Sequence, residues 1–155
     1  KRVMDYLNMV NDQNHQISVK LSAKMDKTAQ AVERLQEENF RLKGQVGQMV
    51  DDMCRKEAER YAGSGSVLIF MDGMDADSVR KLADAVTQTC QGCCAVFSKN
   101  ADGSFKYAMG EKDGDLRQFT KEMNAKLNGR GGGKPFFVQG SVQATEEEIR
   151  RFFEQ

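Results

Sequence analysis

The sequence has a single histidine, His15, and no tryptophan. A serine or cysteine nucleophile needs a basic partner to activate it. Structural zinc needs four cysteine or histidine ligands. His15 lies outside the apolar positions of a helical pattern, so we expect its ring to be solvated. One isolated histidine therefore argues against a self-sufficient active site in this chain.

Cysteines are also few, and their spacing does not favour a metal site. Cys90 and Cys93 form the only C-x-x-C pair and supply two ligands, while Cys94 should point to the opposite face of a strand and Cys54 lies far away in the sequence. We therefore expect ordinary buried thiols rather than zinc or a redox pair. No cofactor is expected in this stretch. Free cysteines without a signal peptide predict a reducing, cytoplasmic location.

Net charge and long apolar runs are missing as well. Lysine plus arginine and aspartate plus glutamate both total 23, so no overall field draws the chain to nucleic acid. No apolar run approaches the roughly 20 residues of a membrane span, and no signal peptide pattern is present. Because the chain starts at Lys1 inside a helical pattern, we expect it to be a fragment of a longer protein.

Residues 1–62 show apolar residues alternating at spacings of three and four. This repeat is typical of a narrow coiled-coil seam. A break near residues 22–26 predicts two helices folded back as an antiparallel hairpin, with Leu7 beside Leu42 and Val10 beside Asn39. The seam positions are Val3, Leu7, Val10, Asn14, Ile17 and Leu21 in the first helix, and Thr28, Val32, Leu35, Asn39, Leu42, Val46, Met49 and Met53 in the second.

The second helix is longer than the first, which leaves Met49 and Met53 without a partner in the hairpin. They are predicted to contact the globular part, a second copy of the chain, or residues upstream of Lys1. A homodimer formed through this helical arm is one expectation. A plain spacer is the simpler interpretation of the arm.

Residues 63–66 are rich in glycine and serine and predict a flexible linker. Residues 67–155 then predict a compact, layered α/β domain. Its elements are a buried strand at 67–71, a helix at 75–90, a hairpin of strands at 93–99 and 104–110, a helix at 114–128, a strand from 136, and a last helix that Thr145 and Glu148 open as a capping box. The first strand, helix and second strand form a β-α-β unit with a right-handed crossover.

The stretch Asn128-Gly-Arg-Gly-Gly-Gly-Lys-Pro135 predicts either an anion site or a tight turn. Glycine lets several backbone N–H groups point at one place, and Arg130 and Lys134 add positive charge. The spacing fits neither a Walker A loop nor a dinucleotide fingerprint. Nucleotide hydrolysis is therefore not predicted.

The charge around this stretch is locally basic. From Arg117 to Lys134 there are five basic residues and one acid, Glu122. The candidate nucleic-acid-binding residues are Arg117, Lys121, Lys126, Asn128, Arg130, Gly131, Gly132, Gly133 and Lys134.

The run from Asp115 to Phe153 closely resembles the DHH-associated C-terminal domain of alanyl-tRNA synthetases and long alanyl-tRNA editing proteins. The residues that match the family's glycine-rich loop, proline and "QG" strand are Gly129, Gly131, Gly132, Gly133, Pro135, Gln139 and Gly140. The helical segment before it resembles the connection to the editing domain. Where DHH phosphoesterases have histidine after the glycines, this chain has Lys134 and Pro135.

The resemblance implies a non-catalytic tRNA-binding and assembly module that works at the outer corner of an alanine-accepting tRNA. The parent would be an alanine–tRNA ligase or a deacylase of mischarged tRNA, with zinc in a preceding editing domain. Two alternatives remain: an oligomerisation domain with a purely structural glycine loop, and the substrate-binding half of a DHH-type phosphoesterase.

Overall fold

The computed structural model describes residues 1–154. Its contacts divide the chain into two compact units, Lys1–Gln48 and the residues from Met49 onward. The division falls inside the longest helix, because the last turns of that helix pack on the globular part. Among the described residues, no helix is both long enough and apolar enough to cross a membrane.

The first unit is helical, as the 3.5-residue repeat predicted, but its seam is uncovered. It holds α1 (Arg2–Lys20), the short 3₁₀ helix η1 (Met25–Lys27) and most of α2 (Thr28–Arg60). Helix α1 buries no residue. Seven of the seam side chains are 41–72% exposed: Val3, Leu7, Ile17, Val32, Leu35, Leu42 and Val46. Val10 and Leu21 are partly buried.

The predicted antiparallel pairing of the two helices is therefore corrected: within the described residues, Leu7 does not pack beside Leu42. The segment that joins α1 to α2 explains part of this difference between the predicted hairpin and the structure. The turn after α1 contains Ser22 at φ +49°, and η1 follows before α2 starts. Asp26 lies inside η1, and the hydroxyl of Thr28 donates to the Met25 carbonyl at 3.1 Å.

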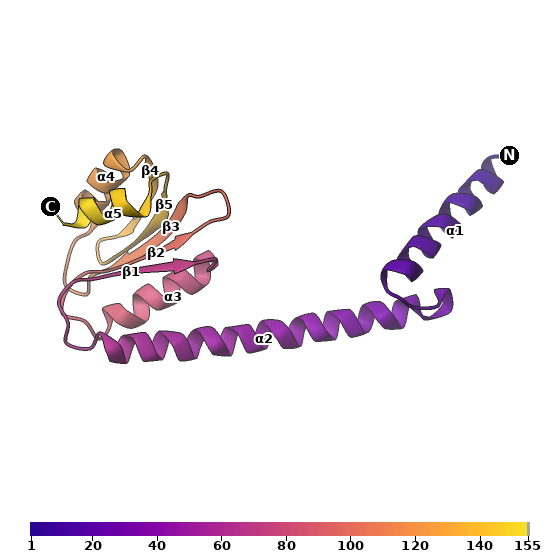
Figure 1. The fold of residues 1–155 in the computed structure, drawn as a ribbon, viewed down its shortest axis with the longest axis horizontal. Helices are drawn as coiled ribbons and strands as arrows, with labels where there is room; N and C mark the ends of the chain where they lie inside the picture. Colours follow the sequence, from indigo (N-terminus) through magenta and orange to yellow (C-terminus); the bar gives the residue numbers. More distant parts are fainter. Residues whose placement is uncertain (155) are drawn as a thin grey trace. The chain divides into compact units, whose positions relative to one another are not determined.

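The second unit is built on a five-stranded mixed sheet with the order β1-β2-β3-β5-β4 (Figure 1). Strands β1 and β2 are parallel, and every other pair is antiparallel. The strands are β1 (Val67–Asp72), β2 (Cys94–Lys99), β3 (Phe105–Gly110), β4 (Gly129–Lys134) and β5 (Phe137–Val142). The layered α/β prediction is confirmed, and the first three strands lie where the apolar runs placed them.

Helices cover both faces of this sheet, as Figure 1 shows: α3 (Ala76–Thr87) lies on one side, and α4 (Arg117–Lys126) and α5 (Glu146–Phe153) lie on the other. The α3 side has a core of Val79, Leu82 and Val86 against the β1 and β2 side chains. The other side packs Phe97, Met109, Met123, Val138 and Ile149 together. Alternation along β2 supplies both cores, because successive strand residues face opposite sides.

The helix starts follow from their capping residues. The Asp75 carboxylate accepts a hydrogen bond from the Ser78 backbone N–H at 2.7 Å and begins α3. Thr145 and Glu148 form the predicted capping box of α5. In both cases a side-chain oxygen satisfies an N–H that has no intrahelical partner.

The end of α2 packs on the α3 side of the sheet and resolves one of the sequence expectations. Cys54 is only 6% exposed, and Val50 and Met53 pack around the same core. Met49 is 70% exposed. Of the two methionines left over by the hairpin prediction, Met53 therefore contacts the globular part, whereas Met49 does not share in that core.

The glycine-serine segment before β1 is not free. The Gly63 N–H donates to the Thr89 carbonyl at 2.9 Å, and the Gln91 N–H donates to the Ser64 carbonyl at 2.6 Å. The Ser66 hydroxyl accepts from the Cys93 N–H at 3.2 Å. These bonds join the segment to the α3–β2 connection, so the expectation of a flexible linker is corrected.

Candidate nucleic-acid interface

The glycine stretch is a β-strand at the edge of the sheet. Gly129–Lys134 form β4, which pairs with β5 on one side and, among the residues that the structure describes, has no strand on the other. Neither the concave nest nor the tight turn expected from the sequence is present in this described segment. Glycine has a low strand propensity, and for this reason composition pointed to a loop.

The close approach of neighbouring atoms explains why glycine occupies this strand. A Cβ added to Gly131 would clash with the Gln139 carbonyl and the Tyr107 hydroxyl. A Cβ on the opposite residue, Gly140, would clash with the Arg130 carbonyl. The pair of glycines therefore leaves the space into which Tyr107 projects. Gly132 differs, because a Cβ there would meet nothing within 4 Å.

A chain of hydrogen bonds connects β3, α4 and β4 at this point. The Tyr107 hydroxyl donates to Asn124 Oδ1 at 3.1 Å, and Asn124 Nδ2 donates to the Gly131 carbonyl at 3.4 Å. Burial raises the pKa of the Tyr107 hydroxyl above its ordinary value, so Tyr107 stays protonated as a donor at neutral pH. No local sequence pattern indicates this arrangement, because its members lie on β3, α4 and β4.

The backbone N–H groups of β4 point in alternating directions. Lys134 and Phe137 are paired on either side of the two-residue turn 135–136, and the residues that flank such a turn form a hydrogen-bonded pair. Continuing the antiparallel alternation turns Gly132 toward β5 and leaves Gly131 and Gly133 with N–H groups on the open edge. The open edge thus carries the N–H and C=O groups of Gly131 and Gly133 in a straight row, with the Gly131 carbonyl accepting from Asn124, instead of three converging amides.

The two charged residues of β4 lie on the α3 side of the sheet. Directly paired residues in an antiparallel sheet share a face, and Arg130 and Lys134 pair with Ser141 and Phe137. Both side chains belong to exposed residues. Lys134 Nζ lies 5.8 Å from the centroid of the Phe136 ring. A hollow of about 350 Å³ adjoins the strand, lined by Arg80, Asp84, Gly132, Lys134 and Gln139 among others.

The basic residues of α4 lie on the other side of the sheet from those of β4. Arg117 is engaged by Asp115, with 2.6 Å between Nη2 and Oδ2, and these hydrogen bonds lower the pKa of the Asp115 carboxyl to about 2. Lys121 is exposed, and Lys126 Nζ lies 5.4 Å from the Phe152 ring centroid. The candidate residues therefore form two basic strips separated by the sheet edge.

Asn128 lies between these strips, at the junction of α4 and β4. It adopts φ +49°, a left-handed conformation that asparagine tolerates better than most residues, and it is exposed. Its place at the junction turns the chain from the helix directly into the edge strand.

The cysteines do not form a reactive centre among the described residues. All four are free. Burial, reinforced by the charge of Glu111, raises the pKa of the Cys93 thiol to about 12, and burial raises that of Cys94 as well. A protonated thiol is a weak nucleophile and a poor metal ligand. Within residues 1–154, no three His, Cys, Asp or Glu side chains gather in a way that could hold a metal ion.

The second unit is thus a small α/β domain with an exposed glycine edge strand. Residues 64–155 match the DHHA1 domain, and the chain belongs to that family. This confirms the resemblance seen in the sequence.

Three relatives are alanine–tRNA ligases. The ligase of Acholeplasma laidlawii (strain PG-8A) is 29% identical over 79 residues, which cover 51% of this chain and 9% of the ligase. That of Thiobacillus denitrificans is 28% identical over 123 residues, 74% of this chain and 14% of the ligase. That of Shewanella loihica is 26% identical over 136 residues, which cover 84% of this chain and 15% of the ligase. The chain thus spans 9–15% of the length of these ligases.

A solved structure shares the fold. The C-Ala domain from Aquifex aeolicus alanyl-tRNA synthetase matches with a TM-score of 0.51 at 20% sequence identity, over 60% of this chain and 92% of that one. At this identity the similarity concerns the fold alone. The match agrees with the fold described above, a mixed sheet with helices on both faces.

Proposed function

We propose that this chain is a non-catalytic tRNA-binding module, the C-terminal part of a protein related to alanyl-tRNA synthetase. The observation that carries the proposal is the exposed edge of β4, where the Gly131 and Gly133 amides lie beside the Arg130 and Lys134 side chains. Backbone amides and basic side chains are the groups that contact phosphate oxygens. The family membership and the tRNA ligases among the relatives support the same function.

The basic residues of α4 would extend this contact along the RNA backbone. Lys121 and Lys126 would approach it from the other side of the sheet edge, with Asn128 between the two strips. Arg117 contributes less, because Asp115 already neutralises it. Contacts of this kind read the shape and phosphates of an RNA rather than its sequence.

The parent protein, in this proposal, deacylates mischarged alanine-accepting tRNA. The chemistry would lie in a zinc-containing editing domain outside this chain, and the module described here would hold the tRNA. The support is the family match together with the alanine–tRNA ligases among the relatives.

Double substitution of Arg130 and Lys134 by alanine is expected to weaken tRNA binding and to flatten its salt dependence. Loss of two phosphate contacts should lower the slope of log K against log salt by about 1.5. Binding of alanine-accepting tRNA would be measured by fluorescence anisotropy from about 50 to about 200 mM salt.

The matched control is Lys112→Ala with Arg151→Ala, which removes the same two charge types from exposed positions of the same unit. It should retain the wild-type slope. Equal slopes for wild type and for the Arg130/Lys134 variant would remove these residues from the interface.

A second candidate function is self-association through the helical arm, and the uncovered seam favours it. Leu35, Leu42 and Val46 are 57%, 46% and 58% exposed on one face of α2. Asn39 occupies the same seam, where a polar residue can fix register or oligomeric state at some cost in stability. A second copy would bury this stripe.

Replacing Leu35 and Leu42 by lysine is expected to dissociate such a dimer, because the change buries two charges in its seam. Sedimentation velocity over a concentration series measures the result. Gln48→Lys adds one charge on the far side of α2 and should leave the assembly intact. A wild-type chain that sediments as a monomer throughout the series would contradict this candidate.

A further inference from the structure

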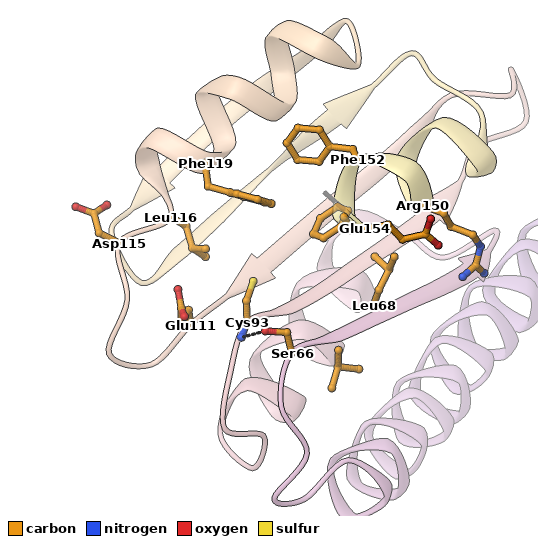
Figure 2. Close-up of a pocket in the computed structure, with 12 residues that line it drawn as sticks. Ser66, Leu68, Cys93, Glu111, Asp115, Leu116, Phe119, Arg150, Phe152 and Glu154 are labelled. Atoms are coloured by element: carbon orange, nitrogen blue, oxygen red, sulfur yellow. Dashed lines mark hydrogen bonds between the residues drawn. The ribbon is translucent and has the colours of Figure 1, made fainter.

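A pocket on the α4–α5 side of the sheet lies next to the basic residues of α4, since its lining residues Asp115 and Phe152 contact Arg117 and Lys126. Its cavity volume is about 460 Å³, within the usual range for sites that hold an organic ligand. Figure 2 shows Leu68 from β1, Leu116 and Phe119 around α4, and Phe152 from α5 surrounding the hollow.

The wall of this pocket is aromatic and apolar. The Phe119 ring centroid lies 5.3 Å from that of Phe152 and 5.5 Å from that of Phe153, and both pairs are inclined rather than parallel. Phe119, Phe152 and Phe153 are only partly buried. An additional aromatic ring entering the pocket could extend this edge-to-face arrangement.

The mouth of the pocket is acidic. Three carboxylates, those of Glu111, Asp115 and Glu154, line it together with one guanidinium, that of Arg150. Asp115 is neutralised by Arg117, and Arg150 is held by Glu146 at 2.6 Å between Nη2 and Oε1. Within the described residues, no ion pair engages Glu111 or Glu154.

We propose that this pocket binds a segment of a partner protein that carries an aromatic side chain next to a lysine or arginine. The ring would enter the hollow against Phe119 and Phe152, and the cation would lie beside Glu111 or Glu154, which Figure 2 shows at different places on the rim. The charge of the rim favours this occupant over an acidic peptide, because Glu111 and Glu154 have no ion-pair partner among the described residues. The site is therefore separate in location and in charge from the β4 edge.

The test uses the full chain, labelled with ¹⁵N, and three capped pentapeptides. The first has a central phenylalanine flanked by lysine and arginine, the second replaces both flanking residues by glutamate, and the third replaces the phenylalanine by alanine. The first should shift the amide signals of Leu116, Phe119 and Phe152. The other two should bind at least about tenfold more weakly, or about 1.4 kcal/mol.

Charge reversal at the rim supplies a matched pair of variants on the same stretch of chain. Glu154→Lys should weaken the basic peptide at least about fivefold, whereas Glu147→Lys, which is exposed and does not line the pocket, should change its affinity by less than about twofold. The exposure of both positions keeps the fold intact, and thermal unfolding of each variant verifies this.

Three outcomes would overturn the proposal. The first is equal binding of the acidic and basic peptides. The second is an equal effect of the two lysine variants. The third is a set of signal shifts at Leu68 and Cys93, which line the pocket away from the basic residues of α4, caused by tRNA or by raised protein concentration without peptide; these shifts would assign the pocket to RNA or to a second copy of the chain.

Discussion

Replacement of Phe97 by alanine is expected to lower the free energy of unfolding by about 3–5 kcal/mol. Phe97 is fully buried on β2 and is surrounded by aromatic rings: Phe70 at 5.7 Å, Tyr107 at 5.7 Å and Phe153 at 5.8 Å between centroids. Truncation would leave a cavity that three strands and α5 share. Since total stability is about 5–15 kcal/mol for most domains, the loss would be a large fraction of it.

Phe40→Ala is the matched control, since the same atoms are removed from a side chain that is 82% exposed. Its effect should stay within about 0.5 kcal/mol. Urea unfolding followed by far-UV circular dichroism would compare the two. Similar losses for both variants would contradict the placement of Phe97 at the centre of the sheet.

The glycines of β4 should divide into those that are required and one that is not. Gly131→Ala is expected to destabilise the chain by about 1–3 kcal/mol, because the new methyl group overlaps the Gln139 carbonyl and the Tyr107 hydroxyl. Gly132→Ala has open space around the new Cβ. It should be neutral, or stabilising by up to about 1 kcal/mol through lower unfolded-state entropy.

Amide hydrogen exchange would show which strands are destabilised by Gly131→Ala and not by Gly132→Ala. Gly131→Ala should speed exchange along β5, where the ladder to β4 would be strained, and should break the Tyr107–Asn124 hydrogen bond. Gly132→Ala should leave both unchanged. If both variants unfold at the wild-type midpoint, the close packing around Gly131 does not limit stability.

These two glycines also bear on the proposed tRNA contact. Gly132→Ala places a methyl group on the same face as Arg130 and Lys134 without disturbing the fold. A change in tRNA binding by this variant would therefore report crowding at the strand edge and not unfolding of β4. The network from Tyr107 through Asn124 to Gly131 holds β4 in place from the side opposite those two cations. The edge strand is therefore positioned by the α4 side of the sheet and presents its charges on the α3 side.

Much of the fold was readable from local patterns. The run Val67–Met71, the amphipathic spacing of Val79, Leu82 and Val86, and the Thr145–Glu148 capping box predicted strands and helices that the structure confirms. Each of these signals arises within a few residues of chain. The resemblance of residues 115–153 to a known family was equally local, and the DHHA1 match confirms it.

The features that the sequence mispredicted depend on contacts between distant residues. Leu7 and Leu42 belong to a seam whose period is clear, but a repeat does not specify whether its partner is the next helix or another chain. The segment at Gly63–Ser66 has the composition of a flexible linker, yet hydrogen bonds to Thr89, Gln91 and Cys93 hold it.

The sequence by itself determined the α/β class, the capped helices, the family and the local excess of positive charge between Arg117 and Lys134. Only the tertiary structure decided that residues 129–134 form an edge strand. Glycine tolerates many backbone conformations, so its neighbours can hold such a stretch in a strand despite its low strand propensity. Here those neighbours are β5, which pairs with the strand, and Tyr107, which occupies the space that a Cβ at Gly131 would need.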